Sequence, residues 1–414
     1  MITAHSKDEY SEKQGMNSTH SVIDTREAYL AATAALAAGT GPVGVDAERA
    51  SGFTYSQRAY LIQIFRRGAG TFLFDPPMIG DFSELNAVLA DEEWILHAAS
   101  QDLACLREVG LNPGRIFDTE LAARLLGLPR VGLGTVVEEL LGIHLAKEHS
   151  AANWSTRPLP ESWLVYAALD VELLPDLRDQ MVDLLVESDK TDLAAQEFVA
   201  VLDKPAAAAR IDPWRRLSGI HSLRGQRNLT AARELWIARD DLARETDVSP
   251  GRLVPDASII AAARVLPTTR QALSALREFT GRASRNELDR WWAALQAAQT
   301  STDMPQAKPH TDTLPPPRAW AERNPEADVR FRAARVALTV LTEERSIPLE
   351  NLLTPDYLRR VCWAPPAPAD AESVGQALAL LGARPWQIDA TAQLIADAFV
   401  EVLQTPAEPA EPHS

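Results

Sequence analysis

The chain has only two cysteines in 414 residues, Cys105 and Cys362, and each lies in an apolar stretch far from the other. This scarcity excludes a disulfide framework and a cysteine-rich zinc site, and it is typical of a reducing compartment. The sequence also lacks an apolar run of the ~18–20 residues that a membrane-spanning helix requires. Its polar first 21 residues lack the apolar segment of a secretory signal. We therefore expect a cytoplasmic protein with no membrane contact, and no feature points to an obligatory protein partner.

Charge is unevenly distributed along the chain, whose net charge is −16. Residues 1–209 contain 16 Lys/Arg and 31 Asp/Glu, a balance of −15, whereas residues 210–296 contain 15 and 10, a balance of +5. A local basic surface can bind phosphate even when the whole chain is acidic. A solvated, arginine-rich helical surface without any ligand explains the same charge, so composition leaves both interpretations open.

The first half of the chain has the pattern of a mixed sheet flanked by helices. Polar residues 1–21 predict a disordered tail, and the first helix is expected over residues 25–38. Apolar and β-branched runs predict a short strand at 43–46 and a hairpin formed by 59–65 and 70–75. Helical and strand patterns then alternate, which favours a layered α/β domain. The expected elements are helices at 81–90, 101–109, 118–127, 134–142 and 161–186, and a strand at 94–97.

Strand patterns end near residue 204, and two helical blocks follow. They occupy residues 211–299 and 318–404, separated by a proline-rich linker at 300–317, and a polar tail occupies 405–414. Each block has a long amphipathic helix, an Arg/Glu pair and then a leucine pattern near a Pro-Asp. We interpret them as two copies of one module, the second diverged. Two unrelated bundles with similar amphipathicity remain the alternative.

Four acids and a tyrosine stand out as candidate functional residues. Asp46 and Glu48 are two apart at the end of a predicted buried strand, so both side chains point to one side. Asp102 is expected in the first turn of a helix, and Tyr166 and Asp170 are four apart on one helical face. Taken singly, each has an ordinary explanation as a solvated strand end, a helix-dipole contact or a packed helix face.

Brought together at one edge of the sheet, these four carboxylates would repel one another unless they bound cations. Hard oxygen ligands suit Mg²⁺ or Mn²⁺, and two such ions ~3.5–4 Å apart can stabilise both the attacking and the leaving oxygen of a phosphodiester. A neighbouring tyrosine could orient the attacking water. The combination therefore points to two-metal phosphodiester hydrolysis.

The order of these residues resembles the DEDD exonucleases, in the branch that contains a tyrosine, and specifically the ribonuclease D family. The first, basic helical block is similar to the helicase-and-RNase-D C-terminal (HRDC) domain in the segment 235–244, and the second block is the weaker match. The segments that carry the family resemblance are Asp46–Glu48 with 54–64, then 96–103, 117–123, 154–159 and 166–171.

The resemblance implies an RNase H-like mixed sheet flanked by helices over residues 22–204, followed by two all-α HRDC-type modules at 211–299 and 318–404. It implies a 3′–5′ exoribonuclease that releases mononucleotides from RNA with a free 3′ end, tRNA precursors included. Further residues would line or support the site and contact the substrate. By position, the two metal ions (Mg²⁺ or Mn²⁺) would be bound by Asp46, Glu48, Asp102 and Asp170, Tyr166 would orient the water, and the substrate-contacting residues would be Gln63, His97, Trp154 and Arg157.

Two other functions remain open at this stage. A DNA 3′–5′ exonuclease would use the same acids, because two-metal chemistry does not require a 2′-hydroxyl. A nucleic-acid-binding scaffold with a decayed site is the other, although all five key positions are intact.

Overall fold

The computed structural model describes residues 20–145, 149, 151–205, 210–279, 281–306 and 314–404. The predicted tail at 405–414 lies outside this part of the chain, as does the predicted tail at 1–21 apart from its last two residues. Part of the predicted linker, residues 307–313, also lies outside it. Among the described residues, no helix is both long enough and apolar enough to cross a bilayer.

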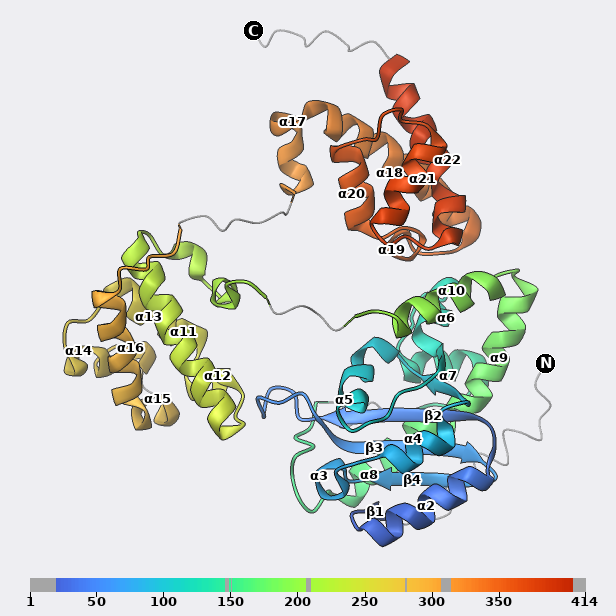
Figure 1. The fold of residues 1–414 in the computed structure, drawn as a ribbon, viewed down its shortest axis with the longest axis horizontal. Coiled ribbons are helices and arrows are strands. Elements are labelled where there is room, and N and C mark those ends of the chain that lie inside the picture. The colour runs from blue at the N-terminus through green and yellow to red at the C-terminus, as the bar shows by residue number, and fades with distance from the viewer. Residues whose placement is uncertain are drawn as a thin grey trace.

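A six-stranded mixed sheet forms the N-terminal part, in the order β1-β4-β3-β2-β5-β6 (Figure 1). The predicted hairpin is confirmed: β3 and β4 pair antiparallel, and β2 pairs antiparallel with β3. On its other side β2 pairs parallel with β5, and β5 with β6, so these three strands end at one edge of the sheet. The strands are β1 (Val22–Ile23), β2 (Thr40–Arg49), β3 (Ala59–Arg67), β4 (Gly70–Phe74), β5 (Glu93–Leu96) and β6 (Arg115–Asp118).

Helices cover both faces of this sheet. On one face, Tyr29 packs edge-on against Phe74 and Phe82, whereas the opposite face holds Leu61 and Leu73 in a separate buried cluster with the first half of the predicted helix 161–186. The helices of this part are α2 (Arg26–Ala38), α3 (Pro76–Ile79), α4 (Ser83–Leu89), α5 (Leu103–Glu108), α6 (Thr119–Leu125), α7 (Leu133–Leu141), α8 (Glu161–Glu172), α9 (Leu174–Glu187) and α10 (Thr191–Leu202).

Gly44 in β2 allows helix α8 to lie directly on the sheet. A Cβ atom at Gly44 would be 2.7 Å from the carbonyl oxygen of Val171, closer than any real contact. A residue with a side chain would therefore push α8 away from β2. The glycine thus sets the distance between the strand that carries Asp46 and the helix that carries Asp170.

The single helix predicted over 161–186 is wrong, because α8 ends at Glu172 and α9 begins at Leu174. Pro175 lies at the second position of α9, where its missing N–H costs no helical hydrogen bond. The predictions also missed β1 and β6, which have two and four residues and carry too little pattern to be recognised.

Two helical modules follow, as the composition predicted. The first has its own apolar core and the second shares a continuous core with the sheet domain. The first contains α11 (Gln226–Thr246), α12 (Pro250–Leu253), α13 (Asp256–Val265), α14 (Arg270–Ser274), α15 (Arg282–Asn286) and α16 (Leu288–Thr300). The second contains α17 (Trp320–Arg323), α18 (Pro325–Arg345), α19 (Leu349–Leu352), α20 (Pro355–Trp363), α21 (Ala371–Leu380) and α22 (Pro385–Gln404).

Candidate active site

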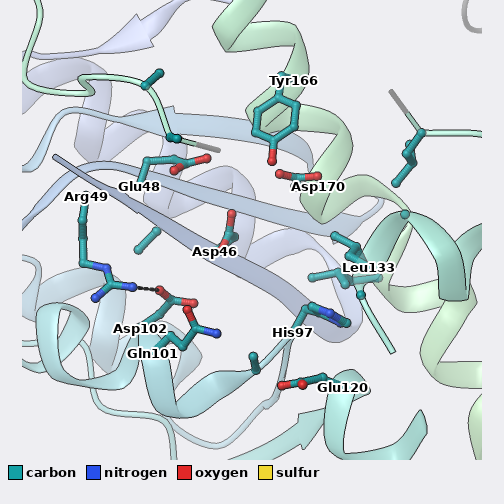
Figure 2. Close-up of a pocket in the computed structure, with 18 of the residues that line it drawn as sticks. Asp46, Glu48, Arg49, His97, Gln101, Asp102, Glu120, Leu133, Tyr166 and Asp170 are labelled. Carbon is teal, nitrogen blue, oxygen red and sulfur yellow. Dashed lines mark ion pairs between the residues drawn. The ribbon is translucent and has the colours of Figure 1, made fainter. Parts of the chain in front are cut away.

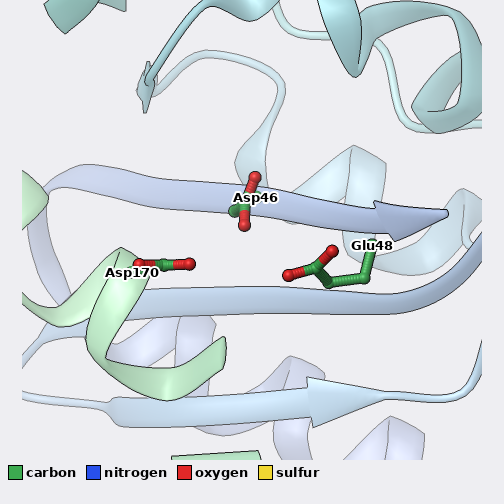
Figure 3. Close-up of side chains that lie close together, drawn as sticks. All are labelled: Asp46, Glu48 and Asp170. Atoms are coloured by element: carbon green, nitrogen blue, oxygen red, sulfur yellow. The ribbon is translucent and has the colours of Figure 1, made fainter. Parts of the chain in front are cut away.

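Three of the predicted acids meet at the end of β2. Asp46 and Glu48 are two residues apart in β2, so their side chains lie on the same face of the strand. Asp170 approaches them from α8 (Figure 3). One carboxylate oxygen from each residue lies within 4.8 Å of those of the other two. Residues separated by more than 120 positions are thus close enough to share one ligand.

Asp102 approaches the same site from the neighbouring strand. It precedes α5, just after the single turn that follows β5, and is almost fully buried. The carboxylate of Asp118, at the end of β6, accepts hydrogen bonds from the backbone N–H groups of Ala98 and Ala99, at 3.0 and 2.9 Å. Because Ala98 has a left-handed backbone (φ 61°), these bonds hold an otherwise unfavourable turn and fix the direction in which Asp102 points.

All four acids and Tyr166 line one cavity of about 720 Å³ (Figure 2). It lies at the edge of the sheet where β2, β5 and β6 end, between α8 and the start of α7. Its other described lining residues are Ala47, Arg49, Ser51, His97, Ala98, Gln101, Glu120, Gly132, Leu133, Gly134, Leu145, Ala151, Ala152 and Leu174.

Burial and mutual repulsion make the acid cluster electrostatically costly. Burial, followed by the charges of Asp46, Asp170 and Asp102, raises the pKa of Glu48 to about 10. Burial and the charge of Asp46 raise the pKa of Asp170 to about 8, and burial also raises the pKa values of Asp46 and Asp102. A divalent cation would offset this repulsion, so the donor set of hard carboxylate oxygens fits a Mg²⁺-like ion.

Tyr166 lies one helical turn before Asp170, and its hydroxyl points toward that carboxylate in the cavity (Figure 2). Burial, and then the charges of Asp170 and Glu48, raise its pKa, so the phenol keeps its proton. The Tyr166 ring lies beside the ring of Trp154, and the two ring centroids are 6.5 Å apart. Tyr166 can therefore present a hydrogen-bonding hydroxyl in a fixed position beside the acids.

The four residues predicted to line or support the site take different positions. His97 lines the cavity, and its Nδ1 lies 2.9 Å from the hydroxyl oxygen of Thr119. Burial lowers the pKa of His97 to about 4, so its ring is neutral near pH 7. Fully buried Gln63 donates from Nε2 to Asp46 at 3.2 Å and so orients that carboxylate from behind.

Trp154 and Arg157 lie behind the site, outside the cavity lining. Trp154 is fully buried and packs against Trp163 as well as Tyr166. Arg157 donates to the Asp75 carboxylate at 2.6 Å and to the Tyr60 carbonyl at 2.8 Å, so it connects this loop to the sheet. In these positions both residues support the site, and direct contact with a substrate stays a prediction.

Sequence reasoning missed several residues that line the cavity, above all Arg49. Its Nη2 lies 3.9 Å from the Asp102 carboxylate. Glu120 and Leu133, from the starts of α6 and α7, were also missed, because nothing in the local pattern distinguishes them from ordinary helix-start residues. For Arg49, its place directly after Glu48 is the one sequence signal that could have identified it.

Comparison with protein families assigns a description to each part of the chain. Residues 21–186 match a family described as 3'-5' exonuclease, residues 228–295 match the HRDC domain, and residues 313–399 match a family described as 3' to 5' exonuclease C-terminal domain. The fold, the carboxylate cluster and these matches define a 3′–5′ exonuclease. The second helical module thus matches a different description from the first, and its origin by duplication stays a prediction.

Similarity to individual relatives identifies the family within the 3′–5′ exonucleases. The chain is 30% identical over 315 residues to ribonuclease D of Escherichia coli, a match that covers 75% of this chain and 81% of the relative. The chain therefore belongs to the ribonuclease D family, as the motifs predicted. It is also 31% identical over 239 residues to ribonuclease D of Desulfotalea psychrophila, covering 56% of this chain and 63% of that protein.

Solved structures agree with this family. A protein from Bifidobacterium adolescentis superposes with a TM-score of 0.86 at 36% identity, covering 92% of this chain and 97% of that one. The crystal structure of Escherichia coli RNase D, described as an exoribonuclease involved in structured RNA processing, superposes with a TM-score of 0.66 at 26% identity. That match covers 95% of this chain and all of the other, so the likeness extends over the helical modules.

Proposed function

We propose that this chain is a divalent-metal-dependent 3′–5′ exoribonuclease that removes mononucleotides from RNA 3′ ends, tRNA precursors among them. The observation that carries the proposal is the convergence of Asp46, Glu48 and Asp170 within 4.8 Å, in a cavity that Asp102 and Tyr166 also line. Membership of the ribonuclease D family supports RNA as the substrate. The two cysteines of this chain are free and buried, which is consistent with a cytoplasmic location.

The reaction would be a direct hydrolysis. An oxygen of water bonds to the phosphorus of the last phosphodiester while the bond to the O3′ of the preceding nucleotide breaks. The water loses a proton, and O3′ gains one. Mg²⁺ or Mn²⁺ ions held by the four carboxylates would supply the positive charge that stabilises the attacking and leaving oxygens.

The chain's own residues would position these reactants. Tyr166 can hold the attacking water through its hydroxyl, which burial keeps protonated. Gln63 holds the Asp46 carboxylate in one orientation, and Asp118 fixes the turn that leads to Asp102. A preorganised arrangement of this kind loses little free energy to reorientation during the reaction.

The proposal is tested by incubating the chain with a 3′-extended tRNA precursor and a matched DNA oligonucleotide, with Mg²⁺, with Mn²⁺ and with a chelator. We expect stepwise shortening of the RNA from its 3′ end, only when a metal is present. Asp170→Asn should abolish shortening, by at least about 10³-fold, while its circular dichroism spectrum stays that of the wild type. Faster digestion of DNA would favour the DNA exonuclease, and no metal-dependent shortening of either would indicate a binding scaffold.

A further inference from the structure

Among the described residues that line the cavity, Arg49 is the one lysine or arginine. The neighbouring acids supply no positive charge in either protonation state, and the His97 ring is neutral because burial lowers its pKa to about 4. A phosphodiester that enters this cavity therefore meets one fixed positive side chain. Guanidinium groups bind phosphate through paired N–H donors, which makes this position chemically distinctive.

Arg49 reaches the cavity from the end of β2. By alternation along this strand it leaves on the face opposite Asp46 and Glu48, and there it lies beside Asp102 (Figure 2). The pairing of β2 with β3 shifts here: Glu48 is opposite Leu61, but Arg49 is opposite Ala59, so Tyr60 is skipped. The unpaired residue belongs to β3, and bulges of this kind occur frequently beside active sites.

The guanidinium of Arg49 is not fully occupied by the protein. Within the described part of the chain, its one ion-pair partner is Asp102, at 3.9 Å, which is too long for a hydrogen bond. About a quarter of the Arg49 side chain is exposed, whereas Asp102 is 7% exposed. A guanidinium has five N–H donors, so those of Arg49 are available to a ligand in the cavity.

We propose that Arg49 is a substrate-binding residue whose guanidinium binds a phosphate group of the RNA 3′ end, and of the nucleoside 5′-monophosphate that leaves. This inference rests on the proposed function and assigns one residue to the phosphate within that site. The alternative is that Arg49 only neutralises part of the charge of Asp102. That role would affect metal binding and stability without a direct contribution to RNA affinity.

The test compares Arg49→Met and Arg49→Lys with the wild type in the full-length chain. Arg26→Met is the matched control, because Arg26 in α2 pairs with Glu84 in α4 and neither residue lines the cavity. KM and kcat are measured on a single-stranded RNA at several salt concentrations, together with the inhibition constant of 5′-AMP. Equilibrium binding of the same RNA is measured in an Asp170→Asn background, which prevents its degradation.

We expect Arg49→Met to raise KM, the RNA dissociation constant and the 5′-AMP inhibition constant by about 10- to 100-fold. The slope of log affinity against log salt should fall by about one, as when a single phosphate contact is lost. Arg49→Lys should recover most of the salt slope but only part of the affinity, since lysine keeps the positive charge but lacks the paired N–H donors of a guanidinium. Arg26→Met should match the wild type.

The inference is overturned if the wild type shortens RNA while Arg49→Met keeps the wild-type KM, salt slope and 5′-AMP inhibition, even if its metal requirement or melting temperature changes. That result would leave the exoribonuclease function intact and make Arg49 a counter-ion of Asp102. If the wild type does not shorten RNA at all, the proposed function fails, and the phosphate site fails with it.

Discussion

At the scale of single residues, the site combines function with a local loss of stability. Asp46, Glu48 and Asp170 lie close together and half-buried. Burial raises the pKa values of all three, and the charge of Asp46 raises those of Glu48 and Asp170 further. In the absence of a cation, each ionised carboxyl in this group destabilises the folded state. The same arrangement is what makes a divalent cation bind tightly, because the ion offsets that repulsion.

The raised pKa values predict a specific pH dependence for the folding stability of the metal-free protein. The folded pKa of Asp170 is about 8, above the ordinary value of 3.8, so the folded state binds this proton more tightly than the unfolded state. Stability is therefore lost as the pH rises through the window from about 4 to 8. Asp170→Asn removes the ionising group, so in a chelator its urea midpoint should match the wild type near pH 4 and exceed it increasingly up to pH 8.

Addition of Mg²⁺ at pH 8 should reverse the order, because the wild type gains a ligand that stabilises the folded state and the variant loses one of the carboxylates that hold it. A midpoint difference that stays constant from pH 4 to 8 in the chelator would contradict the raised pKa of Asp170.

The sequence predicted the acids of this site but not their surroundings. Asp46, Glu48, Asp102, Tyr166 and Asp170 were identifiable because their order and spacing carry the family resemblance. Arg49 was not, because only its place directly after Glu48 distinguishes it, and its position beside Asp102 appears only in the folded chain. The support from Asp118 was equally hidden, since an acid that begins a helix has an ordinary explanation as a cap.

At the scale of elements, the loop at 50–58 between β2 and β3 joins the cavity to the first helical module. It begins directly after Arg49, and Ser51 lines the cavity. The same loop contacts α12 and the residue that ends α11: the backbone N–H of Ser56 donates to Asp247 at 2.8 Å, and Arg252 donates to the carbonyl of Gly52 at 2.7 Å. The position of this module and the shape of the cavity rim are thus physically linked.

Asp247 is the main contact of that loop with the module. Its carboxylate accepts hydrogen bonds from Ser56, Tyr60 and Arg58, and its backbone is left-handed (φ 48°), a conformation that asparagine also tolerates. Asp247→Asn should therefore weaken docking without straining the backbone, by about 1–2 kcal/mol. Backbone amides of 51–58 should exchange with deuterium faster, by about 5- to 30-fold.

Asp241→Asn is the control for this prediction, because Asp241 lies in the last turns of α11, just before Asp247, but is exposed and pairs with Arg244 on that helix. Unchanged exchange of 51–58 in Asp247→Asn would show that the apolar and backbone contacts of the loop suffice to hold the module in place.

At the scale of the whole molecule, the second helical module packs against the sheet domain, a question that the sequence left open. Glu197 in α10 accepts two hydrogen bonds from the Arg384 guanidinium, at 2.6 and 2.7 Å, and one from the indole of Trp386, at 2.8 Å. The Lys190 ammonium bridges the carbonyls of Leu125 and Arg345. The module therefore packs on the sheet domain through polar contacts as well as through a shared apolar core.

This packing predicts that the sheet domain and the second module unfold together, and that Glu197 couples them. Glu197 is nearly fully buried, and its loss leaves Arg384 and the Trp386 N–H without their partner. Removing one member of a buried pair costs about 3–5 kcal/mol, so Glu197→Ala should lower the urea midpoint strongly and separate one transition into two.

Glu187→Ala, at an exposed position at the end of α9, is the matched control and should leave the single transition unchanged. If Glu197→Ala unfolds with the midpoint and cooperativity of the wild type, the apolar contacts between the two parts, and not this ion pair, hold the module on the sheet domain.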